Sequence, residues 1–554
     1  MCHCGVRLYS VGVYTKYVFT IDGSFRTITV PPDATSSLMS FLLCCLRLRG
    51  PSEGSCKRSH RARCPGSITA TDQSILDRVT ISTLPDEVLV QIFYLYANDK
   101  RIGTNGWHTL VQVCQRWRYV VFASPRSLNL QLVYTGKRPM SEMLDVWPVL
   151  PVVAVLTTSS SSGPYVDLWA NISAALESEH HHRICGINLF FNRIEHWERW
   201  ATAMQKPFPA LTFLHIDNYN YNVVTSLPDS FLGGSAPLLR HLELRNCPFP
   251  GIPKLLLSSN RLVYLSLVDI PDSGYISPQD LGTTLSVMSR LETLRVQFRS
   301  RRFPQSRPRS PSTCSVLSAL TCLDFEGAHE YLEDLLAQID APLVNKIEIT
   351  FFMDPNFVVP QLHRLISDAE WFKTFDKAFV CLSYRAIRFV AFREEPYTFP
   401  DFDLEICFTE TDYTFSSLVQ VCSSSMPLLS SLVQLEIVDP IILLRREDDT
   451  ESTQWLELLA PFTAVKDLRL GDQVGRRVCQ ALEELAKERV TEVLPALQNI
   501  FLTGLKPSES VPKLIERFIT ARQLSGHPVA VYPWRGGEEL RYPPRIHDFF
   551  MVLP

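Results

Sequence analysis

One short apolar pattern recurs along most of the chain and constrains its fold more than any other feature. It consists of an apolar residue, two spacers, a second apolar residue, one spacer and a third apolar residue. Seven copies begin 23–29 residues apart, and three more follow after a gap. A strand followed by a helix buries its apolar side only by stacking on its neighbours, so the pattern predicts a solenoid of α/β units. The copies begin at Ile184, Leu211, Leu239, Leu262, Leu291, Leu320, Val344, Leu432, Val465 and Leu497.

These copies resemble irregular leucine-rich repeats, whose length of 20–29 residues they share. In one complete unit, residues 323–325 are expected to form a strand, a helical stripe begins at Tyr331, and Pro342 precedes the next strand. The pattern is lost between about residues 351 and 414, where two or three irregular repeats are expected. The alternative is a non-repeating domain in which strands alternate with helices. A propeller is disfavoured because none of the nine tryptophans precedes an aspartate.

The residue between the second and third apolar positions should face the concave surface, because side chains alternate across a strand. Acids, arginines and a histidine occur at these positions, which fits a protein segment with matched charges better than a polyanion. Solvent exposure alone predicts the same polarity, so both interpretations remain open. The candidate target-binding residues are His215, Glu243, Arg295, Asp324 and Glu348. The complete set adds Asn188, Ser266, Glu436, Arg469 and Phe501.

A different pattern occupies residues 84–125. Pro85 stands in a predicted first helical turn, with Asp86 and Glu87 at the positive end of the helix dipole and apolar residues at helical spacing after them. A second helix is expected to carry an apolar stripe from Leu110 to Val121 and to end before Pro125. About fifty residues cannot bury apolar groups on several sides of two helices, so a partner is expected to cover some of them.

This segment resembles an F-box over residue 81 to roughly residue 132. The order of Leu84-Pro85, Ile92-Phe93 and the Val-Cys-x-x-Trp-Arg step at 113–118 carries the resemblance, although the connection between the helices is longer than usual. The resemblance implies binding to the Skp adaptor, and through it to cullin. An ordinary helical hairpin is the alternative. The residues that the resemblance assigns to adaptor binding are Leu84, Pro85, Val88, Leu89, Ile92, Phe93, Leu110, Val113, Cys114 and Trp117.

Composition and motifs favour protein binding over catalysis. With 54 basic and 58 acidic residues, the net charge of −4 provides no global field for nucleic acid. The usual nucleophile, phosphate-binding and zinc-protease motifs are absent, so no enzyme activity and no cofactor are predicted, and an unrecognised hydrolase is the remaining enzyme alternative. Cys56, His60 and Cys64 lack a fourth ligand at zinc-site spacing, and residues 180–182, three histidines, are expected in a solvated turn, so no metal is predicted.

Cysteine usage and hydropathy suggest a cytoplasmic or nuclear location, or both. The fifteen cysteines are an odd number spread over a long chain, which favours reduced thiols. The longest apolar run, residues 38–46, is far shorter than the roughly 20 residues that span a bilayer, so no membrane partner is expected. The expected organisation is a disordered leader (1–75), an F-box (76–135), a connecting segment (136–180), a leucine-rich-repeat-like solenoid (181–530) and a C-terminal tail (531–554).

The predicted fold class is therefore α/β, with an N-terminal helical F-box followed by an α/β leucine-rich-repeat-like solenoid. The predicted function is that of a substrate-recognition subunit of a Skp–cullin–F-box ubiquitin ligase with an unknown protein target. The alternative is a leucine-rich-repeat scaffold that binds proteins without any connection to ubiquitin ligation.

Overall fold

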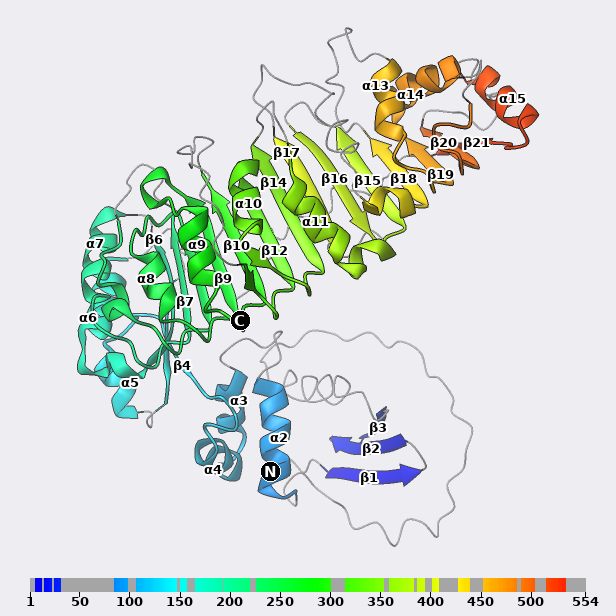
Figure 1. Ribbon diagram of the computed structural model, residues 1–554. Coiled ribbons are helices and arrows are strands. Elements are labelled where there is room, and N and C mark those ends of the chain that lie inside the picture. Colours follow the sequence, from blue (N-terminus) through cyan, green and yellow to red (C-terminus); the bar gives the residue numbers. More distant parts are fainter. Residues whose placement is uncertain are drawn as a thin grey trace, which may run out of the picture. The chain divides into compact units, whose positions relative to one another are not determined.

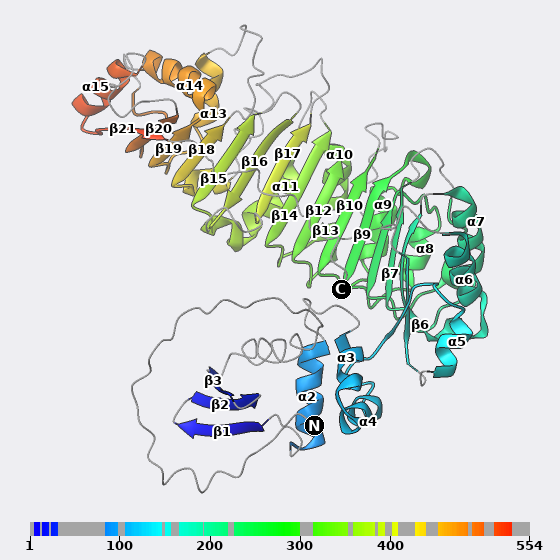
Figure 2. The same cartoon turned by 180° about the vertical axis from the view of Figure 1, so that it is seen from behind.

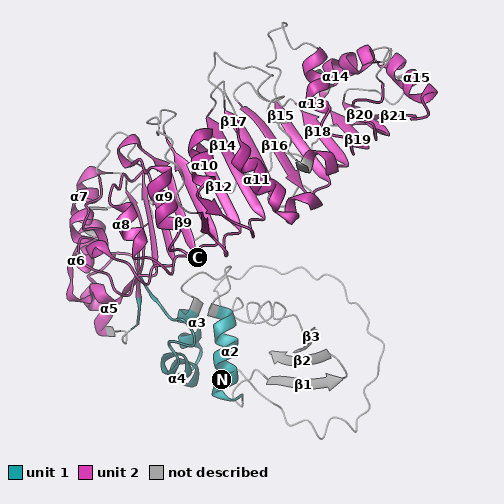
Figure 3. Cartoon of the chain, in the orientation of Figure 1, with its two compact units in different colours: residues 1–133, 149–151, 552–554 teal, residues 134–148, 152–551 magenta. Residues whose placement is uncertain are grey.

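The chain forms two compact units in the computed structural model (Figure 3). The first comprises residues 1–133, 149–151 and 552–554, and the second residues 134–148 and 152–551. The structure describes residues 5–11, 14–21, 24–30, 84–97, 106–146, 150–156, 165–191, 193–219, 226–299, 314–352, 358–382, 386–393, 401–407, 427–438, 452–485, 490–503 and 515–534.

An antiparallel sheet of three strands lies at the start of the first unit (Figure 1). Its strands are β1 (Gly5–Val11), β2 (Tyr14–Ile21) and β3 (Ser24–Val30), in that order. This sheet occupies part of the stretch expected to be a disordered leader. A hairpin of two strands is marginally stable in water, and β1 adds a third strand to the pair β2 and β3. Residues 31–83 lie outside the described residues.

Three helices follow in the first unit: α2 (Asp86–Ala97), α3 (Gly106–Val113) and α4 (Gln115–Ala123). The expectation of one continuous helix from Leu110 to Val121 is wrong, because the chain breaks at Cys114. Its backbone is extended (φ −157°, ψ 170°), and its Sγ accepts a hydrogen bond from the Trp117 N–H at 3.4 Å. Cys114 therefore acts as the N-cap of a new helix, in the role that serine or asparagine usually fills.

A sixteen-stranded sheet dominates the second unit, in the order β21-β20-β19-β18-β15-β16-β17-β14-β12-β10-β9-β8-β7-β6-β5-β4. Neighbours from β21 to β5 are parallel, except that β16 is antiparallel to both β15 and β17. The strands are β4 (Leu132–Tyr134), β5 (Val152–Leu156), β6 (Ile184–Phe191), β7 (Phe213–Asn218), β8 (His241–Arg245), β9 (Tyr264–Ile270), β10 (Thr293–Phe298), β12 (Cys322–Gly327), β14 (Lys346–Phe352), β15 (Lys377–Leu382), β16 (Ala386–Phe392), β17 (Phe402–Cys407), β18 (Gln434–Val438), β19 (Asp467–Leu470), β20 (Asn499–Thr503) and β21 (Ala530–Trp534).

Helices line one face of this sheet. Figure 1 shows α7 to α11 in front of the strands, and Figure 2, seen from behind, shows the strands in front. A separate pair, β11 (Ser315–Val316) and β13 (Ile339–Asp340), forms a two-stranded sheet. The helices and 3-10 turns are α5 (Met140–Val146), α6 (Tyr165–Glu177), η3 (Glu179–Arg183), α7 (Ile194–Ala203), η4 (Phe231–Gly234), α8 (Ile252–Leu257), η5 (Asp272–Gly274), α9 (Pro278–Leu285), α10 (His329–Leu336), α11 (Pro360–Asp368), η6 (Glu370–Thr374), η7 (Pro427–Ser431), α13 (Ser452–Leu459), α14 (Asp472–Glu484) and α15 (Glu516–Leu524).

The register that the apolar pattern predicts is present in the sheet. Leu214 lies opposite Leu242, Ile216 lies opposite Leu244, and the same alignment continues from β6 to β14 and from β18 to β20. These apolar residues point to the helices, as does Phe191, whose ring centroid lies 5.1 Å from that of Trp200 on α7. The chain is thus an α/β repeat solenoid with its core between sheet and helices.

In the described residues of the stretch without the pattern, the strands do not follow one another along the sheet in sequence order, as two or three stacked repeats would. The chain passes from β14 to β15, three positions further along the sheet, returns antiparallel as β16, and inserts β17 beside β14. It then continues with β18 on the other side of β15. Because β15, β16 and β17 lie along the sheet in the reverse of their sequence order, no repeat register can be followed there.

The sheet also extends beyond the range expected for the solenoid, residues 181–530. Within the expected connecting segment, β5 pairs in parallel with β6. At the other end, β21 pairs in parallel with β20, from Ala530 opposite Asn499 to Trp534 opposite Thr503. The sheet therefore begins before residue 181 and includes the start of the expected C-terminal tail, of which residues 535–554 lie outside the described residues.

Candidate functional site

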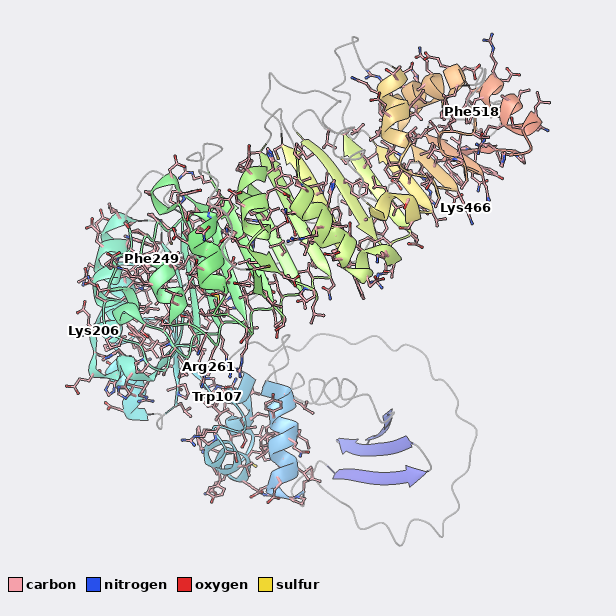
Figure 4. All side chains as sticks on the ribbon, viewed as in Figure 1. Trp107, Lys206, Phe249, Arg261, Lys466 and Phe518 are labelled. Atoms are coloured by element: carbon pink, nitrogen blue, oxygen red, sulfur yellow. The ribbon has the colours of Figure 1, made fainter. Side chains whose placement is uncertain are left out.

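Helices α2, α3 and α4 share a small apolar core. Leu89, Phe93, Leu110 and Trp117 are buried, and the ring centroids of Phe93 and Trp117 lie 4.7 Å apart. Trp107, labelled in Figure 4, is buried as well and donates from Nε1 to the Gln131 carbonyl oxygen at 3.0 Å. Four of the ten residues assigned to adaptor binding therefore hold the helices together.

Arg116 on α4 fixes the turn that begins α2. Its Nη2 donates to the Leu84 carbonyl oxygen at 2.5 Å and to Asp86 Oδ1 at 2.6 Å, and its Nε donates to the same carboxylate oxygen at 3.2 Å. The Leu84-Pro85 turn is thus bound to α4, thirty residues away in sequence. Sequence reasoning missed this role, because the contact depends on how α4 packs against the start of α2 and leaves no sign in the apolar spacing.

Apolar side chains remain exposed on the same three helices. Val88 and Val113 are each 38% exposed, and Tyr94 and Tyr119 are exposed as well. Of the other residues assigned to adaptor binding, Pro85 and Cys114 are exposed, and Leu84 and Ile92 are half-buried. The helical unit therefore divides the assigned residues into a buried set that maintains it and an exposed or half-buried set open to a partner.

The residues expected on the concave surface form one continuous row across the helix-free face. Each lies directly opposite its neighbour in the strand register, and the row continues through the insertion at Asp403, Val390 and Phe379. These three were missed, because the reversed strand order hides them. The central row, in sheet order, is Asn188, His215, Glu243, Ser266, Arg295, Asp324, Glu348, Asp403, Val390, Phe379, Glu436, Arg469 and Phe501.

Solvent exposure does not explain the polarity of the central row. Glu243, Arg295, Asp324 and Glu348 are all buried. Buried charges require partners, and Arg295 Nε lies 3.0 Å from Asp324 Oδ2, while Gln297 Nε2 donates to Asp324 Oδ1 at 3.0 Å. For Arg295 and Asp324, the polarity therefore reflects specific pairing across neighbouring strands.

A second buried ion pair stands two strands further on. Arg388 Nε donates to both carboxylate oxygens of Asp403, at 2.8 Å and 3.1 Å, and Arg388 Nη2 also donates to Oδ2. Burial lowers the pKa of Arg388, but the hydrogen bonds and charge of Asp403 outweigh this and raise it. Such a two-pronged arginine–carboxylate contact fixes both side chains in position.

Glu348 lies between Asp324 and Asp403 in the register, and both of those acids already pair with an arginine. In the described part of the chain the Glu348 carboxylate makes no hydrogen bond or ion pair. Burial and the charges of the two aspartates raise the pKa of Glu348 to about 7. Further along the row, burial raises the pKa of Glu436 to about 7 despite the charge of Arg469. Each of these acids would gain from a cationic ligand.

The first candidate target-binding residues form a separate cluster with aromatic neighbours. His215 Nδ1 and His241 Nε2 each lie 3.7 Å from Glu243 Oε2, and the rings of His241 and Tyr264 stack at 4.1 Å. Burial lowers the pKa of His215. Burial raises the pKa of Glu243, but the hydrogen bond from His241 and the charge of His215 outweigh it, so the pKa lies below its ordinary value.

The described residues contain no group of three or more His, Cys, Asp or Glu side chains that could hold a metal ion. The three histidines at 180–182 lie in the turn η3, where His181 and His182 contact backbone carbonyl oxygens through Nδ1. Cys56, His60 and Cys64 lie outside the described residues. No helix in the described ranges has the length and hydropathy to cross a membrane.

Comparison with known proteins gives limited similarity. No family model matches the sequence, and no curated protein matches it. One solved structure with some similarity is the leucine-rich repeat-containing protein LegL7 from Legionella pneumophila. It shares 13% sequence identity, the match covers 72% of this chain and 97% of that one, and the TM-score is 0.22. The assignment of this chain as an α/β repeat solenoid rests on its own strand order and register.

Proposed function

We propose that this chain is a substrate-recognition subunit of a Skp–cullin–F-box ubiquitin ligase. Helices α2, α3 and α4 bind the Skp adaptor, which connects the chain to cullin. The helix-free face of the sheet holds a target protein through the central row, including His215, Glu243, Arg295, Asp324 and Glu348. Transfer of ubiquitin belongs to a separate enzyme, and this chain contributes by holding the target near it.

The observation that carries the adaptor proposal is the exposed apolar surface of the small helical unit. Val88, Tyr94, Val113 and Tyr119 project from three short helices, although the unit has a buried core of its own. Exposed apolar groups on so small a unit are typical of an interface with another protein. The Arg116 contacts hold the Leu84-Pro85 turn in a fixed position, which reduces the ordering that binding would require.

Co-purification with the Skp adaptor tests this proposal. The double variant Val88→Asp/Val113→Asp is expected to reduce the recovered adaptor at least tenfold, because two carboxylates would be buried against an apolar partner surface. Both side chains are already exposed, so the helices should still fold. Gln91→Asp, which adds a charge at an exposed position of α2, is the control and should leave recovery unchanged.

Equal recovery with wild type and the double variant, or no recovery with either, would contradict adaptor binding by these residues. It would favour the alternative, a repeat scaffold that binds proteins without a ubiquitin ligase. The variant Leu84→Ala/Pro85→Ala provides a second test of adaptor recovery, since it alters only the turn before α2.

A further inference from the structure

The centre of the helix-free face is acidic. The strands β12, β14 and β17 place Asp324, Glu326, Glu348, Asp403 and Glu405 on this face, since alternate residues of a strand share a face. The basic side chains near them are Arg295, Arg388 and Lys346. Five carboxylates against three basic groups leave two negative charges when all are ionised. This face therefore attracts a cationic ligand and repels phosphate.

Glu348 is the acid at this centre that the described residues leave unpaired. It is 8% exposed, and its two neighbours in the row are held by Arg295 and Arg388. A buried carboxylate without a partner is unfavourable, so a cation that reached it would replace a missing interaction. This distinguishes Glu348 from the acids around it.

An apolar cluster lies beside the acidic centre on the same face. Phe379, Cys381 and Val390 are buried together, and the partly buried side chains of Phe392 and Val438 pack against them. The central row passes through this cluster, because Val390 lies opposite Asp403 and Phe379 lies opposite Val390. An apolar side chain of a ligand would find its contacts here.

Beyond the apolar cluster lies a second acid, Glu436, which makes no hydrogen bond or ion pair within the described residues, although Arg469 lies opposite it in the register. Glu436 is opposite Phe379 in the register and is 4% exposed. Its Oε1 atom is buried and has no hydrogen-bond partner. Where the structure describes it, the row thus presents, in order, a carboxylate without a hydrogen bond or ion pair, an apolar cluster and a second such carboxylate.

We propose that this face binds an extended protein segment that carries one basic residue on each side of an apolar residue. One basic residue pairs with Glu348 and the other with Glu436. This rests on target binding by the sheet face, and it does not depend on adaptor binding. Four strand intervals separate the two acids, or about 19 Å. An extended segment spans that distance in about six residues. The apolar residue near its midpoint contacts Phe392 and Val438.

Selection from a random twelve-residue peptide library on the immobilised full chain tests this proposal. The enriched peptides are expected to contain lysine or arginine at two positions about six apart, with an apolar residue between them. Enrichment without basic residues, enrichment of acidic residues, or no enrichment at all would overturn it.

The affinity of one enriched peptide then assigns the two acids. Glu348→Gln and Glu436→Gln should each weaken binding by about 10- to 100-fold, the range expected for losing a charge-assisted hydrogen bond. Glu198→Gln, which removes a carboxylate from the exposed surface of α7, should leave the affinity unchanged. Equal affinity of all four proteins would overturn the assignment. Because the adaptor is absent from this measurement, its outcome is independent of the co-purification result.

Discussion

Replacing Arg388 with methionine is expected to lower the free energy of unfolding of the second unit by about 3–5 kcal/mol. Arg388 is 7% exposed and Asp403 4% exposed, so the variant would leave a carboxylate buried without its cation. Removing one partner of a buried ion pair costs more than the pair itself contributes, because the remaining charge stays desolvated. Urea unfolding followed by tryptophan fluorescence measures the effect.

The double variant Arg388→Met/Asp403→Leu is the matched control. It removes both charges, so most of the lost stability should return. The expectation would be contradicted if the free energy of unfolding of the single variant lay within about 1 kcal/mol of wild type, or if the double variant were less stable than the single one. Either result would show that the buried Asp403 carboxylate does not need the two hydrogen bonds from Arg388 Nε.

Glu348→Gln is expected to stabilise the protein at pH 8 by about 2–3 kcal/mol and to have little effect near pH 4.5. The pKa of Glu348 is about 7 in the folded chain, against an ordinary value of 4.5. A raised pKa means that the folded state favours the protonated acid, so its contribution to stability is lost as pH rises from 4.5 through 7. Glutamine remains neutral throughout and avoids that loss.

Urea unfolding of wild type and variant at several pH values checks this result. The groups that face Glu348 are Asp324, Asp403, Arg295 and Lys346, and they are present in both proteins, so the comparison isolates the effect of removing the Glu348 charge. A stability difference that stays constant between pH 4.5 and 8 would show that Glu348 titrates normally. Glu436→Gln should behave similarly, since its pKa is also about 7.

The repeated part of the fold could be predicted from the sequence because every repeat meets the same physical requirement. An apolar residue on the helix side of a strand must align with its counterpart on the next strand, and Leu214, Leu242 and Leu265 do so. The same alternation placed Arg295 and Asp324 side by side on the opposite face. Their burial and pairing could not be read from the pattern, which distinguishes sides of a strand and not degrees of exposure.

The insertion and its ion pair could not be predicted for a topological reason. Asp403 and Arg388 meet only because β17 returns between β14 and β16, and sequence order gives no sign of that return. In the first unit, the apolar period located the helices but not the break at Cys114, since an extended N-cap leaves the spacing of apolar residues almost unchanged. The contact of Arg116 with Asp86 likewise depends on how two helices pack.

Amide hydrogen exchange of the full chain, with and without purified Skp adaptor, tests the central claim most directly. The account predicts that the adaptor slows exchange in α2, α3 and α4, with the largest change around Val88 and Val113, and leaves the strands β6 to β20 unchanged. Unaltered exchange in these helices at saturating adaptor, or protection confined to the sheet, would contradict the assignment of this chain as a subunit of that ligase.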